Sequence, residues 1–435
     1  MRVSTRSLAL ACLLHAPLIP LAAQQLTATE RAEAVATIWA EARYNFAYWD
    51  RTRADWDSAF VANLKLAAAP QSDFLFYRRL RRFVAVLGDG QAAVIPAPSL
   101  RSRIARPPLL VQSVERRSFI LDYAENDEMR VARPERLGEI LAVQGIPADA
   151  WIRDSVLPEI SAATPANRWQ RAAAVMLQGE KGTTLQLLLR VPSGDQRGVS
   201  VTRSVSLNDR WPLDPPPFAV ESLSGSLVVV RLNSLADQDV VPQFDRAFPD
   251  FAGVQGLVLD LRRAAGGKTD YAYRLLARLT GKPFAAARWR TPDHRAVFRA
   301  WNQPDSATTW YEPSPDTIHP RGDQPSYGGP LSVLASAITA GAAEDFLAAF
   351  RAANRGAIIG EPSAGSPGDA ATFALPKSWT VQFSVTHHMA PDGSEFAGLG
   401  VRPDILLAPS VRDVLAGMDP ALQRAREYLE DGRRR

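Results

Sequence analysis

Cysteine is almost missing from this sequence of 435 residues, which contains only Cys12. That residue lies in an N-terminal segment that we expect to be removed, so the mature chain would hold no cysteine. This excludes disulfide bonds, catalysis by a thiol and metal sites built from cysteine.

Several motifs of other functional classes are also absent. The sequence has neither a G-x-x-x-x-G-K-[ST] nor a G-x-G-x-x-G segment, so nucleotide binding has no support. No cluster of His, Asp and Glu has the spacing of a metal site, and we expect neither a metal nor a cofactor. Basic residues are not interleaved with aromatics as in proteins that bind single-stranded nucleic acid, so we expect no nucleic-acid partner.

Long hydrophobic runs are lacking as well. The apolar run Leu8 to Leu14 is too short to span a bilayer, and Pro17 and Pro20 interrupt the residues after it. Preceded by basic residues and followed by Leu21-Ala22-Ala23, it is typical of an export signal. We therefore predict a signal peptide over 1–23, cleaved after Ala23, and a periplasmic or extracellular protein. A lipid anchor on Cys12 is disfavoured because the apolar run continues past it.

The net charge of +4 is small for this length, and Arg2 and Arg6 of the predicted signal account for two of these charges. The remaining excess lies partly in Arg433-Arg434-Arg435 at the C-terminus, which we interpret as a solvated tail. Hydrophobic residues make up 46% of the chain, enough for two or three domains with cores of their own.

Residues 24–98 are predicted to form an N-terminal helical domain. Thr27 and Glu30 have the spacing of a capping box. Amphipathic helices are expected over 32–48, 56–69 and 73–87. The last has an apolar stripe of Phe76, Leu80, Phe83, Val84 and Leu87, opposite four arginines that we interpret as a solvated face.

Residues 99–205 are predicted to form a small, partly open β domain. Strands are expected over 119–123, 138–143, 184–190 and 199–202, with a helix over 168–177. Pro212 and the run Pro215-Pro216-Pro217 mark a linker over 206–217, because successive prolines cannot join a helix or a central strand.

Strands and helices alternate through much of 218–435, which predicts a multidomain α/β protein whose last domain has a parallel sheet. Expected strands cover 226–232, 256–261 and 357–360, a hairpin covers 370–386, and helices cover 271–279 and 420–429. Residues 283–327 have little periodicity and are interpreted as a long surface excursion.

The segment 331–350 combines a buried strand, a turn of small residues and the start of a helix. Ala343, Phe346, Leu347 and Phe350 recur at the spacing of one buried helix face. In a nucleophile elbow, this arrangement presents a side chain at the tip and backbone N–H groups at the helix N-terminus. The residue at the tip here is Gly341, which has no side chain.

Several segments together resemble the tail-specific, or carboxyl-terminal-processing, serine peptidases, which share a catalytic core with the tricorn protease. The segments that carry the resemblance are Leu87-Gly-Asp-Gly90, Gly138 to Gly145, Gly256-Leu-Val-Leu-Asp-Leu-Arg262 with Gly266-Gly267, Thr339 to Phe346, Gly360-Glu361-Pro-Ser-Ala-Gly365, and Pro391-Asp-Gly393 through Gly398-Leu-Gly-Val-Arg-Pro-Asp404. The resemblance implies a helical domain, a PDZ-like β domain over 99–205, and a crotonase- or ClpP-like α/β core over 218–435 with a C-terminal helix.

The family cleaves peptides through a serine on the elbow, a lysine or histidine base and an oxyanion hole. By resemblance, Gly341 occupies the position of the family's catalytic serine, and Gln91 occupies the position of its catalytic histidine. Ser366 stands where the lysine branch has its base, and Ala397 falls at the orienting glutamate of part of the family.

The resemblance also implies that Gly266 or Gly267 and the amide of Ala342 line the oxyanion hole. The glycines have an alternative interpretation, a strand-to-helix turn that needs positive φ. Glu344 and Asp345 are interpreted as carboxylates that offset the helix dipole in its first turn. The neighbouring His387 and His388 should point to opposite faces of a strand, so that one of them enters the cleft or both are packed.

When the nucleophile and the base are both missing, an acyl-enzyme intermediate cannot form. We therefore predict an exported, degenerate peptidase that binds peptides or protein C-termini without efficient hydrolysis. The alternative is an active serine-type endopeptidase that uses Ser336, Thr339 or Ser366 as nucleophile, or in which Gly341 is an engineered residue. The sequence does not determine the oligomeric state.

Overall fold

A computed structural model describes residues 25–52, 55–223, 226–295, 297–301 and 309–431. The predicted signal peptide, Cys12 and the arginine tail lie outside the described residues. Within the described ranges, every helix is too short or too polar to cross a membrane.

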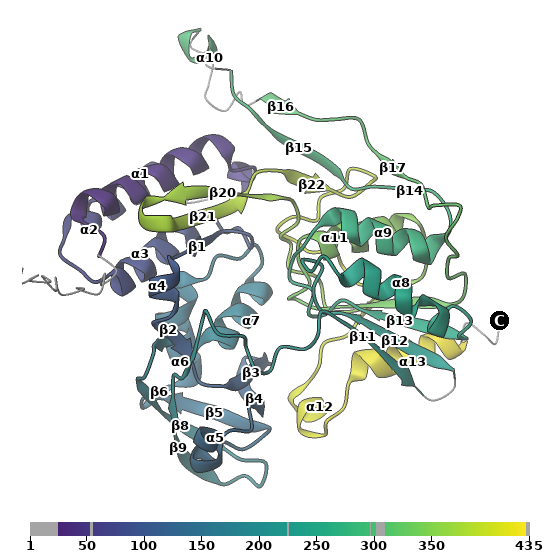
Figure 1. Cartoon of the computed structure of the whole chain (residues 1–435), viewed down its shortest axis with the longest axis horizontal. Coiled ribbons are helices and arrows are strands. Elements are labelled where there is room, and N and C mark those ends of the chain that lie inside the picture. Colours follow the sequence, from purple (N-terminus) through teal and green to yellow (C-terminus); the bar gives the residue numbers. More distant parts are fainter. Residues whose placement is uncertain (1–24, 53–54, 224–225, 296, 302–308, 432–435) are drawn as a thin grey trace, which may run out of the picture.

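A six-stranded sheet forms the centre of the C-terminal half (Figure 1). Its strand order is β11-β12-β13-β18-β19-β23; β11 is antiparallel to β12, and the other neighbours are parallel. The strands are β11 (Phe218–Leu223), β12 (Leu227–Leu232), β13 (Gly256–Asp260), β18 (Leu331–Ala335), β19 (Ala357–Gly360) and β23 (Ile405–Leu406). The parallel sheet predicted from the alternation of strands and helices is therefore present, and the carboxyl ends of β13 and β18 lie side by side.

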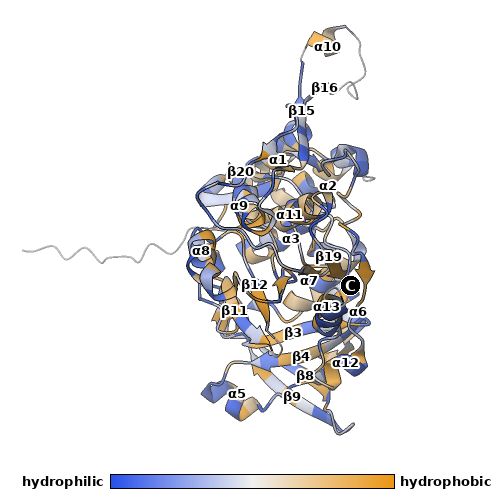
Figure 2. Ribbon diagram, turned by 90° about the vertical axis from the view of Figure 1, so that its right-hand side faces the viewer, coloured by the Kyte–Doolittle hydropathy of each residue, from blue (hydrophilic) through white to orange (hydrophobic). Residues whose placement is uncertain are grey.

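Helices cover both faces of this sheet (Figure 1). One face packs against α8 (Val240–Phe251), α9 (Thr269–Thr280) and α11 (Ala342–Ala352), and the other against α13 (Pro420–Asp431). Figure 2 shows hydrophobic residues on the strands of the sheet, which lies between these two sets of helices. Helix α8 was not predicted, because Pro249 interrupts its helical pattern; in the structure its Phe244, Phe248 and Phe251 pack together.

The N-terminal region contains the three predicted helices and a short 3₁₀ turn. They are α1 (Ala28–Asn45), η1 (Trp49–Arg51), α2 (Trp56–Ala68) and α3 (Asp73–Ala85), followed by β1 (Ala93–Ile95) and α4 (Pro98–Arg101). The capping box at Thr27 and Glu30 is formed, and the predicted stripe of α3 is buried.

The core of this N-terminal region is completed by residues from near the other end of the chain. The hairpin β20 (Ala370–Leu375) and β21 (Trp379–Ser384) pairs with β1, and Trp379, Val381 and Phe383 pack into the helical core. Residues 24–98 therefore share one hydrophobic core with 370–384, and this fixes the turn after α3 next to the central domain.

The arginine face of α3 was interpreted as solvated, and three of its residues prove to be paired as well: Arg82 is exposed, whereas Arg78 and Arg81 are partly buried. Arg78, Arg81 and Arg82 all contact the carboxylate of Glu159, at 2.7, 3.4 and 3.3 Å. Glu159 is 7% exposed, and a buried carboxylate requires cationic partners. The sequence around α3 gave no indication of this contact, because Glu159 lies more than 70 residues further along the chain.

Residues 104–206 form the second unit, which is mainly antiparallel. Its main sheet has the order β3-β4-β5-β8-β9 with β6 beside β5, and a smaller sheet has the order β10-β2-β7. The strands are β2 (Ile104–Arg106), β3 (Leu109–Val114), β4 (Arg117–Tyr123), β5 (Gly138–Val143), β6 (Ile146–Pro147), β7 (Gly179–Glu180), β8 (Thr184–Arg190), β9 (Gln196–Thr202) and β10 (Val205–Ser206). The helices are α5 (Asp127–Ala132), α6 (Ala148–Trp151) and α7 (Pro165–Val175), with short turns η2 (Ile152–Val156) and η3 (Leu157–Glu159).

Helix α7 connects this second unit to the other two. The side-chain amide of Asn167 donates to the carbonyl of Ala337, just after β18, at 2.7 Å. Arg171 donates to the carbonyl of Gly90, in the turn after α3, at 2.8 Å. The two turns that carry Gln91 and Gly341 are thus both held by one helix.

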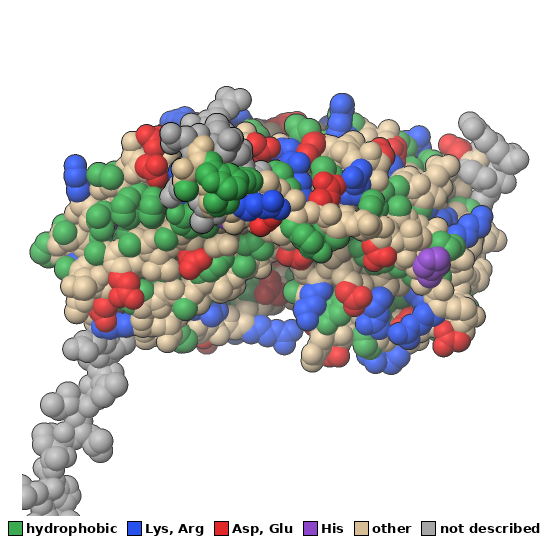
Figure 3. Space-filling model, turned by 90° about the horizontal axis from the view of Figure 1, so that it is seen from above, with side chains coloured by type: hydrophobic (Ala, Val, Ile, Leu, Met, Phe, Trp, Pro, Cys, Tyr) green, Lys and Arg blue, Asp and Glu red, His purple; other side chains and the backbone are tan. Residues whose placement is uncertain are grey.

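The predicted excursion at 283–327 contains a projecting arm (Figure 1). Its elements are β14 (Phe284–Ala285), β15 (Arg288–Asp293), α10 (Val297–Ala300), β16 (Thr309–Tyr311) and β17 (Thr317–Ile318). The base of the arm pairs with β22 (His387–Met389). Figure 3, viewed from the side of the arm, shows hydrophobic side chains at its end, where Val297 and Trp301 are exposed. The remaining elements are α12 (Val411–Leu415) and the 3₁₀ turn η4 (Pro376–Ser378).

Candidate active-site cleft

The turn between β18 and α11 has the backbone of a nucleophile elbow. Gly341 precedes the first residue of α11 and has φ 59° and ψ −127°. This is a strained conformation for a residue with a side chain, which glycine adopts freely. The strand–turn–helix predicted for 331–350 is therefore present, and its tip carries no functional group.

Gln91 lies directly opposite the tip. A Cβ atom built on Gly341 would be 3.0 Å from Gln91 Nε2 and 3.1 Å from the Cα of Gly266. Gln91 Nε2 donates to the carbonyls of Ser366 and Gly368, at 3.4 and 3.2 Å. The structure thus brings Gly341, Gln91 and Gly266 together, with an amide at the position where the resemblance implies a base.

The turn that carries Gln91 is fixed by a buried carboxylate. Asp89 accepts from the backbone N–H of Gln91 at 3.0 Å and from the N–H and hydroxyl of Ser384 at 2.8 and 2.9 Å. Burial raises the pKa of Asp89, and these hydrogen bonds oppose the shift. Gly90 permits the close approach of Ser366, because a Cβ at position 90 would lie 2.1 Å from Ser366 Oγ.

Two backbone N–H groups near the elbow have no acceptor in the described part of the chain. Among the described residues, neither the N–H of Gly267 nor that of Ala342 donates to an acceptor. Gly266 and Gly267 have φ of 124° and 129°, and a Cβ at Gly267 would lie 2.3 Å from the backbone of Leu235. The turn itself therefore requires glycine at position 267. A role in an oxyanion hole and a role in a turn with positive φ are compatible for these glycines. The free N–H groups could hold a carbonyl or carboxylate oxygen.

Glu344 does more than offset the helix dipole. It is fully buried and accepts four hydrogen bonds, from Gly341 N at 3.2 Å, Gly365 N at 2.6 Å, Ser366 N at 2.8 Å and Ser363 Oγ at 2.5 Å. Burial raises the pKa of Glu344 to about 7, although these donors favour the carboxylate. This single side chain fastens the loop 363–366 to the elbow, a role that sequence spacing alone did not reveal.

Asp345 and His388 form a second buried pair one turn from the elbow. Asp345 accepts from His388 Nδ1 at 3.0 Å and from the hydroxyl of Thr269 at 2.8 Å. Burial by itself lowers the pKa of His388, but the nearby Asp345 outweighs it and the pKa is raised. Among the described residues His388 Nε2, which is buried, has no partner.

His387 points the other way, as predicted for neighbours on a strand. Its Nε2 lies 2.9 Å from Glu395, and its ring packs on Tyr48 with the centroids 4.8 Å apart. Burial lowers the pKa of His387. The sequence singled out the adjacent histidines but not their carboxylates, because Asp345 and Glu395 are brought to them by the fold.

The candidate substitute nucleophiles do not occupy the tip of the elbow. Ser336 Oγ donates to the carbonyl of Arg262 at 2.7 Å, and the hydroxyl of Thr339 donates to the carbonyl of Leu261 at 2.9 Å. Ser366 Oγ lies against Gly90, and the atoms nearest to a Cβ built on Gly341 belong to Gln91 and Gly266.

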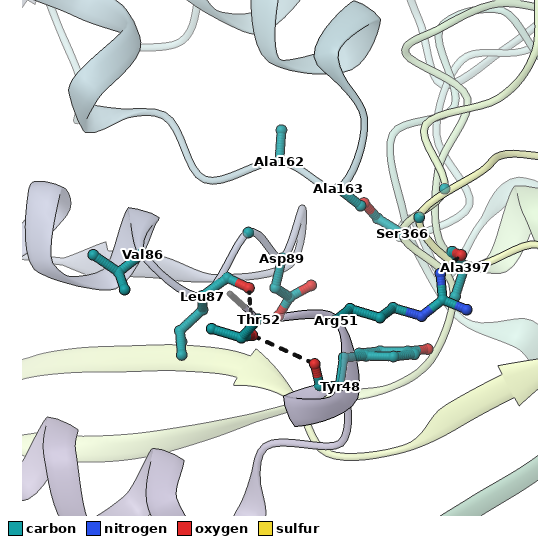
Figure 4. A pocket seen from close by; sticks show the side chains of 13 residues that line it. Tyr48, Arg51, Thr52, Val86, Leu87, Asp89, Ala162, Ala163, Ser366 and Ala397 are labelled. Carbon is teal, nitrogen blue, oxygen red and sulfur yellow. Dashed lines mark hydrogen bonds between the residues drawn. The ribbon is translucent and has the colours of Figure 1, made fainter. Parts of the chain in front are cut away.

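Ala397 is buried and lines the same pocket as Ser366 (Figure 4). Its carbonyl accepts a hydrogen bond from Arg51, whose guanidinium also pairs with Glu395 at 2.9 Å. A methyl group at position 397 cannot orient a base at position 91. In the part of the chain that the structure describes, no three His, Cys, Asp or Glu side chains are grouped so as to hold a metal ion.

The contribution of the His388–Asp345 pair to stability should depend on pH, and this can be tested. Because the pKa of His388 is raised in the folded state, its contribution to stability is fully present below about pH 6.5 and is lost as pH rises through the folded pKa. We expect His388→Gln to lower the free energy of unfolding by about 3 kcal/mol at pH 5.5, since it leaves a buried carboxylate short of its cation.

The difference between wild type and His388→Gln should shrink between pH 6 and pH 9, as measured by urea unfolding. His319→Gln is the matched control, because His319 is exposed. If the difference in the free energy of unfolding between wild type and His388→Gln stays constant or grows with pH, His388 and Asp345 do not form a charged pair.

Comparison with known proteins supports the resemblance seen in the sequence. The model of peptidase family S41 matches residues 226–407. A solved structure of mature CPAF aligns over 93% of this chain and 96% of its own, with a TM-score of 0.71 and 17% identity. The photosystem II D1 C-terminal processing protease aligns over 91% of this chain and 99% of its own, with a TM-score of 0.51 and 20% identity. At these identities the two structures show a shared fold. No curated protein matched the sequence.

Proposed function

We propose that this protein is a degenerate member of peptidase family S41, whose model matches residues 226–407, and that it binds peptides or protein C-termini without efficient hydrolysis. The observation that carries this proposal is the elbow itself. Its backbone is set for a nucleophile, yet Gly341 supplies no hydroxyl and Gln91 supplies an amide that cannot accept a proton from one.

The parts of the cleft that do not make or break bonds are in place. The free N–H groups of Gly267 and Ala342 offer two donors to a peptide carbonyl or a terminal carboxylate. The loop 363–366 and the turn at 89–91 are both fixed by buried carboxylates, so the site is preorganised. Preorganisation favours binding whether or not a reaction follows.

The second unit is proposed to be PDZ-like, and the core crotonase- or ClpP-like. Strand β3 is an edge strand beside α7, the kind of edge to which a peptide can add as a further strand. At this edge, however, Gln170 donates to the carbonyl of Ser113 at 2.9 Å and Trp169 donates to its hydroxyl at 2.9 Å. We therefore favour the elbow cleft as the main peptide site.

The alternative of an active endopeptidase needs a different nucleophile. Ser336 and Thr339 already donate to backbone carbonyls, and Ser366 Oγ lies against Gly90. The geometry therefore favours the degenerate member. Export through the predicted signal peptide is part of the proposal and would place the protein among periplasmic or extracellular polypeptides.

We expect the purified mature protein to remain unlabelled by a fluorophosphonate serine probe, because no serine is activated at the elbow. The same protein should bind a fluorescent peptide with a free C-terminus and leave it intact over hours, as followed by anisotropy and mass spectrometry. The amidated form of that peptide is the matched control and should bind more weakly if the carboxylate is captured. Stoichiometric labelling of any serine, or cleavage of the peptide, would reject the proposal.

A further inference from the structure

A cavity of about 260 Å³ lies between helix α3 and the second unit, and neither Gly341 nor Gln91 lines it. One wall is formed by α3, and the other by the turns before α7, the end of α7 and the residues around β7. Since a water molecule occupies about 30 Å³ in the liquid, the space suits a ligand of roughly nine heavy atoms.

The lining of this cavity has a surplus of positive charge. It contains three arginines, Arg78, Arg81 and Arg203, against two carboxylates, those of Glu159 and Glu180. One negative charge inside the cavity would therefore balance the lining, whereas a cation would add to the surplus.

The two carboxylates do not neutralise Arg203. Glu159 is buried, and its carboxylate already contacts Arg78, Arg81 and also Arg82, which lies outside the lining. Glu180 is exposed, and its carboxylate forms no ion pair with any described residue.

Arg203 is held in the wall by neutral groups. Its Nε donates to the carbonyl of Leu177 at 2.8 Å, and its Nη1 donates to the hydroxyl of Thr183 at 2.7 Å. The guanidinium lies against Gly179, since a Cβ there would be 2.5 Å from Arg203 Cζ. Burial lowers the pKa of Arg203, and the nearby Arg78 lowers it further. An anion beside Arg203 would favour its charged form.

Three side chains of the lining have donors without an acceptor. Within the described chain, no hydrogen bond is made by the hydroxyl of Tyr77, by Nε and Nη2 of Arg81, or by Nη2 of Arg203. None of these atoms belongs to the fully buried polar atoms that lack a partner, so all of them remain accessible. The guanidinium carbon of Arg81 lies 5.6 Å from the ring centroid of Tyr77, which brings two of these side chains together. A carboxylate forms its strongest hydrogen bonds with donors of this kind.

Apolar side chains form much of the remaining lining. Phe74, Trp151, Val156 and Val175 are each partly exposed. The indole N–H of Trp151 donates to the carbonyl of Met176 at 2.8 Å, so Trp151 offers the cavity only its ring. Such walls favour a ligand with an aromatic or apolar body.

We propose that this cavity binds a small organic monocarboxylate with an aromatic or apolar body. The carboxylate is held by the free donors of Tyr77, Arg81 and Arg203. The body of the ligand lies against Phe74 and Trp151. This inference does not rest on peptide binding in the cleft.

The test uses four probes: benzoate, benzamide, benzylammonium and inorganic phosphate. Binding is followed through the methyl resonances of Ile104 and Met176, which line the cavity, in the methyl-labelled mature protein. We expect benzoate to bind with a Kd of about 1 mM, as a good ligand of about nine heavy atoms can reach. Benzamide has the shape of benzoate without the charge, and phosphate has negative charge without the ring. Both should bind at least about tenfold more weakly, and benzylammonium should cause no shift up to about 10 mM.

Two variants locate the site. Arg81→Gln and Arg203→Gln each remove one guanidinium from the lining and should weaken benzoate binding about tenfold. Arg210→Gln is the matched control, because it removes the same charge from an exposed position outside the cavity, and it should leave binding unchanged. The proposal fails if benzoate does not shift these methyl resonances at about 10 mM, or if benzamide or phosphate binds as tightly as benzoate. It also fails if both arginine variants fold, by circular dichroism, and bind benzoate like Arg210→Gln.

Discussion

Replacing Gly341 by serine and Gln91 by histidine in one chain is expected to create measurable peptide hydrolysis. A Cβ on residue 341 lies within 3.0 Å of the present Gln91 Nε2, so a serine hydroxyl and an imidazole at these positions come within hydrogen-bond reach. The free N–H groups of Gly267 and Ala342 are available for the oxyanion. Cleavage of a fluorogenic peptide should rise about 100-fold above the wild-type background.

The gain is limited for two physical reasons. Ala397 provides no carboxylate to orient the new histidine, and loss of an orienting carboxylate costs about 10⁴-fold in related chemistry. A serine at 341 must also adopt φ near 59° with ψ near −127°, a sparsely populated conformation that costs about 1–3 kcal/mol.

The matched control is Gly341→Ala with Gln91→His, which carries the same strain and the same imidazole but no hydroxyl. It should be inert and should not react with a fluorophosphonate. If the serine–histidine variant folds, by its circular dichroism and unfolding midpoint, yet neither cleaves peptide nor reacts with the probe, the assignment of positions 341 and 91 is wrong.

Glu344→Ala is expected to lower the free energy of unfolding by about 3–5 kcal/mol. The change leaves three buried donors without an acceptor, those of Gly365, Ser366 and Ser363, and Gly341 N keeps only the carbonyl of Ser366 at 3.2 Å. The loop 363–366 should open, since this carboxylate holds it on the elbow. Urea unfolding measures the first effect, and amide hydrogen exchange at residues 363–366 measures the second.

Glu430→Ala removes an exposed carboxylate from α13 and serves as the control, with an expected change below about 0.5 kcal/mol. Glu344→Gln should fall between the two, because its amide nitrogen faces donors while its oxygen still accepts. Equal stability of Glu344→Ala and Glu430→Ala would show that Glu344 does not hold the loop.

Local pattern was sufficient for much of the architecture. The capping box at Thr27, the apolar stripe of α3 and the strand–turn–helix around Gly341 were all predicted, and each depends on residues within a few turns of one another. Apolar residues recur about every 2 residues on the buried face of a strand and about every 3.6 residues on that of a helix. The types of these elements could therefore be inferred from the sequence. Helix α8 was missed because Pro249 interrupts its periodicity.

The absence of a hydroxyl at the predicted tip could be inferred from the residues alone, because glycine has no side chain in any fold. The groups that surround the tip became known only from the three-dimensional arrangement of the chain. The carboxylate of Glu344 on the loop 363–366, the pairing of Asp345 with His388 and the convergence of three arginines on Glu159 each join residues far apart in the chain. Their physical reason is burial: a charge removed from water must find its partner in space, and spacing along the chain carries no record of where that partner lies.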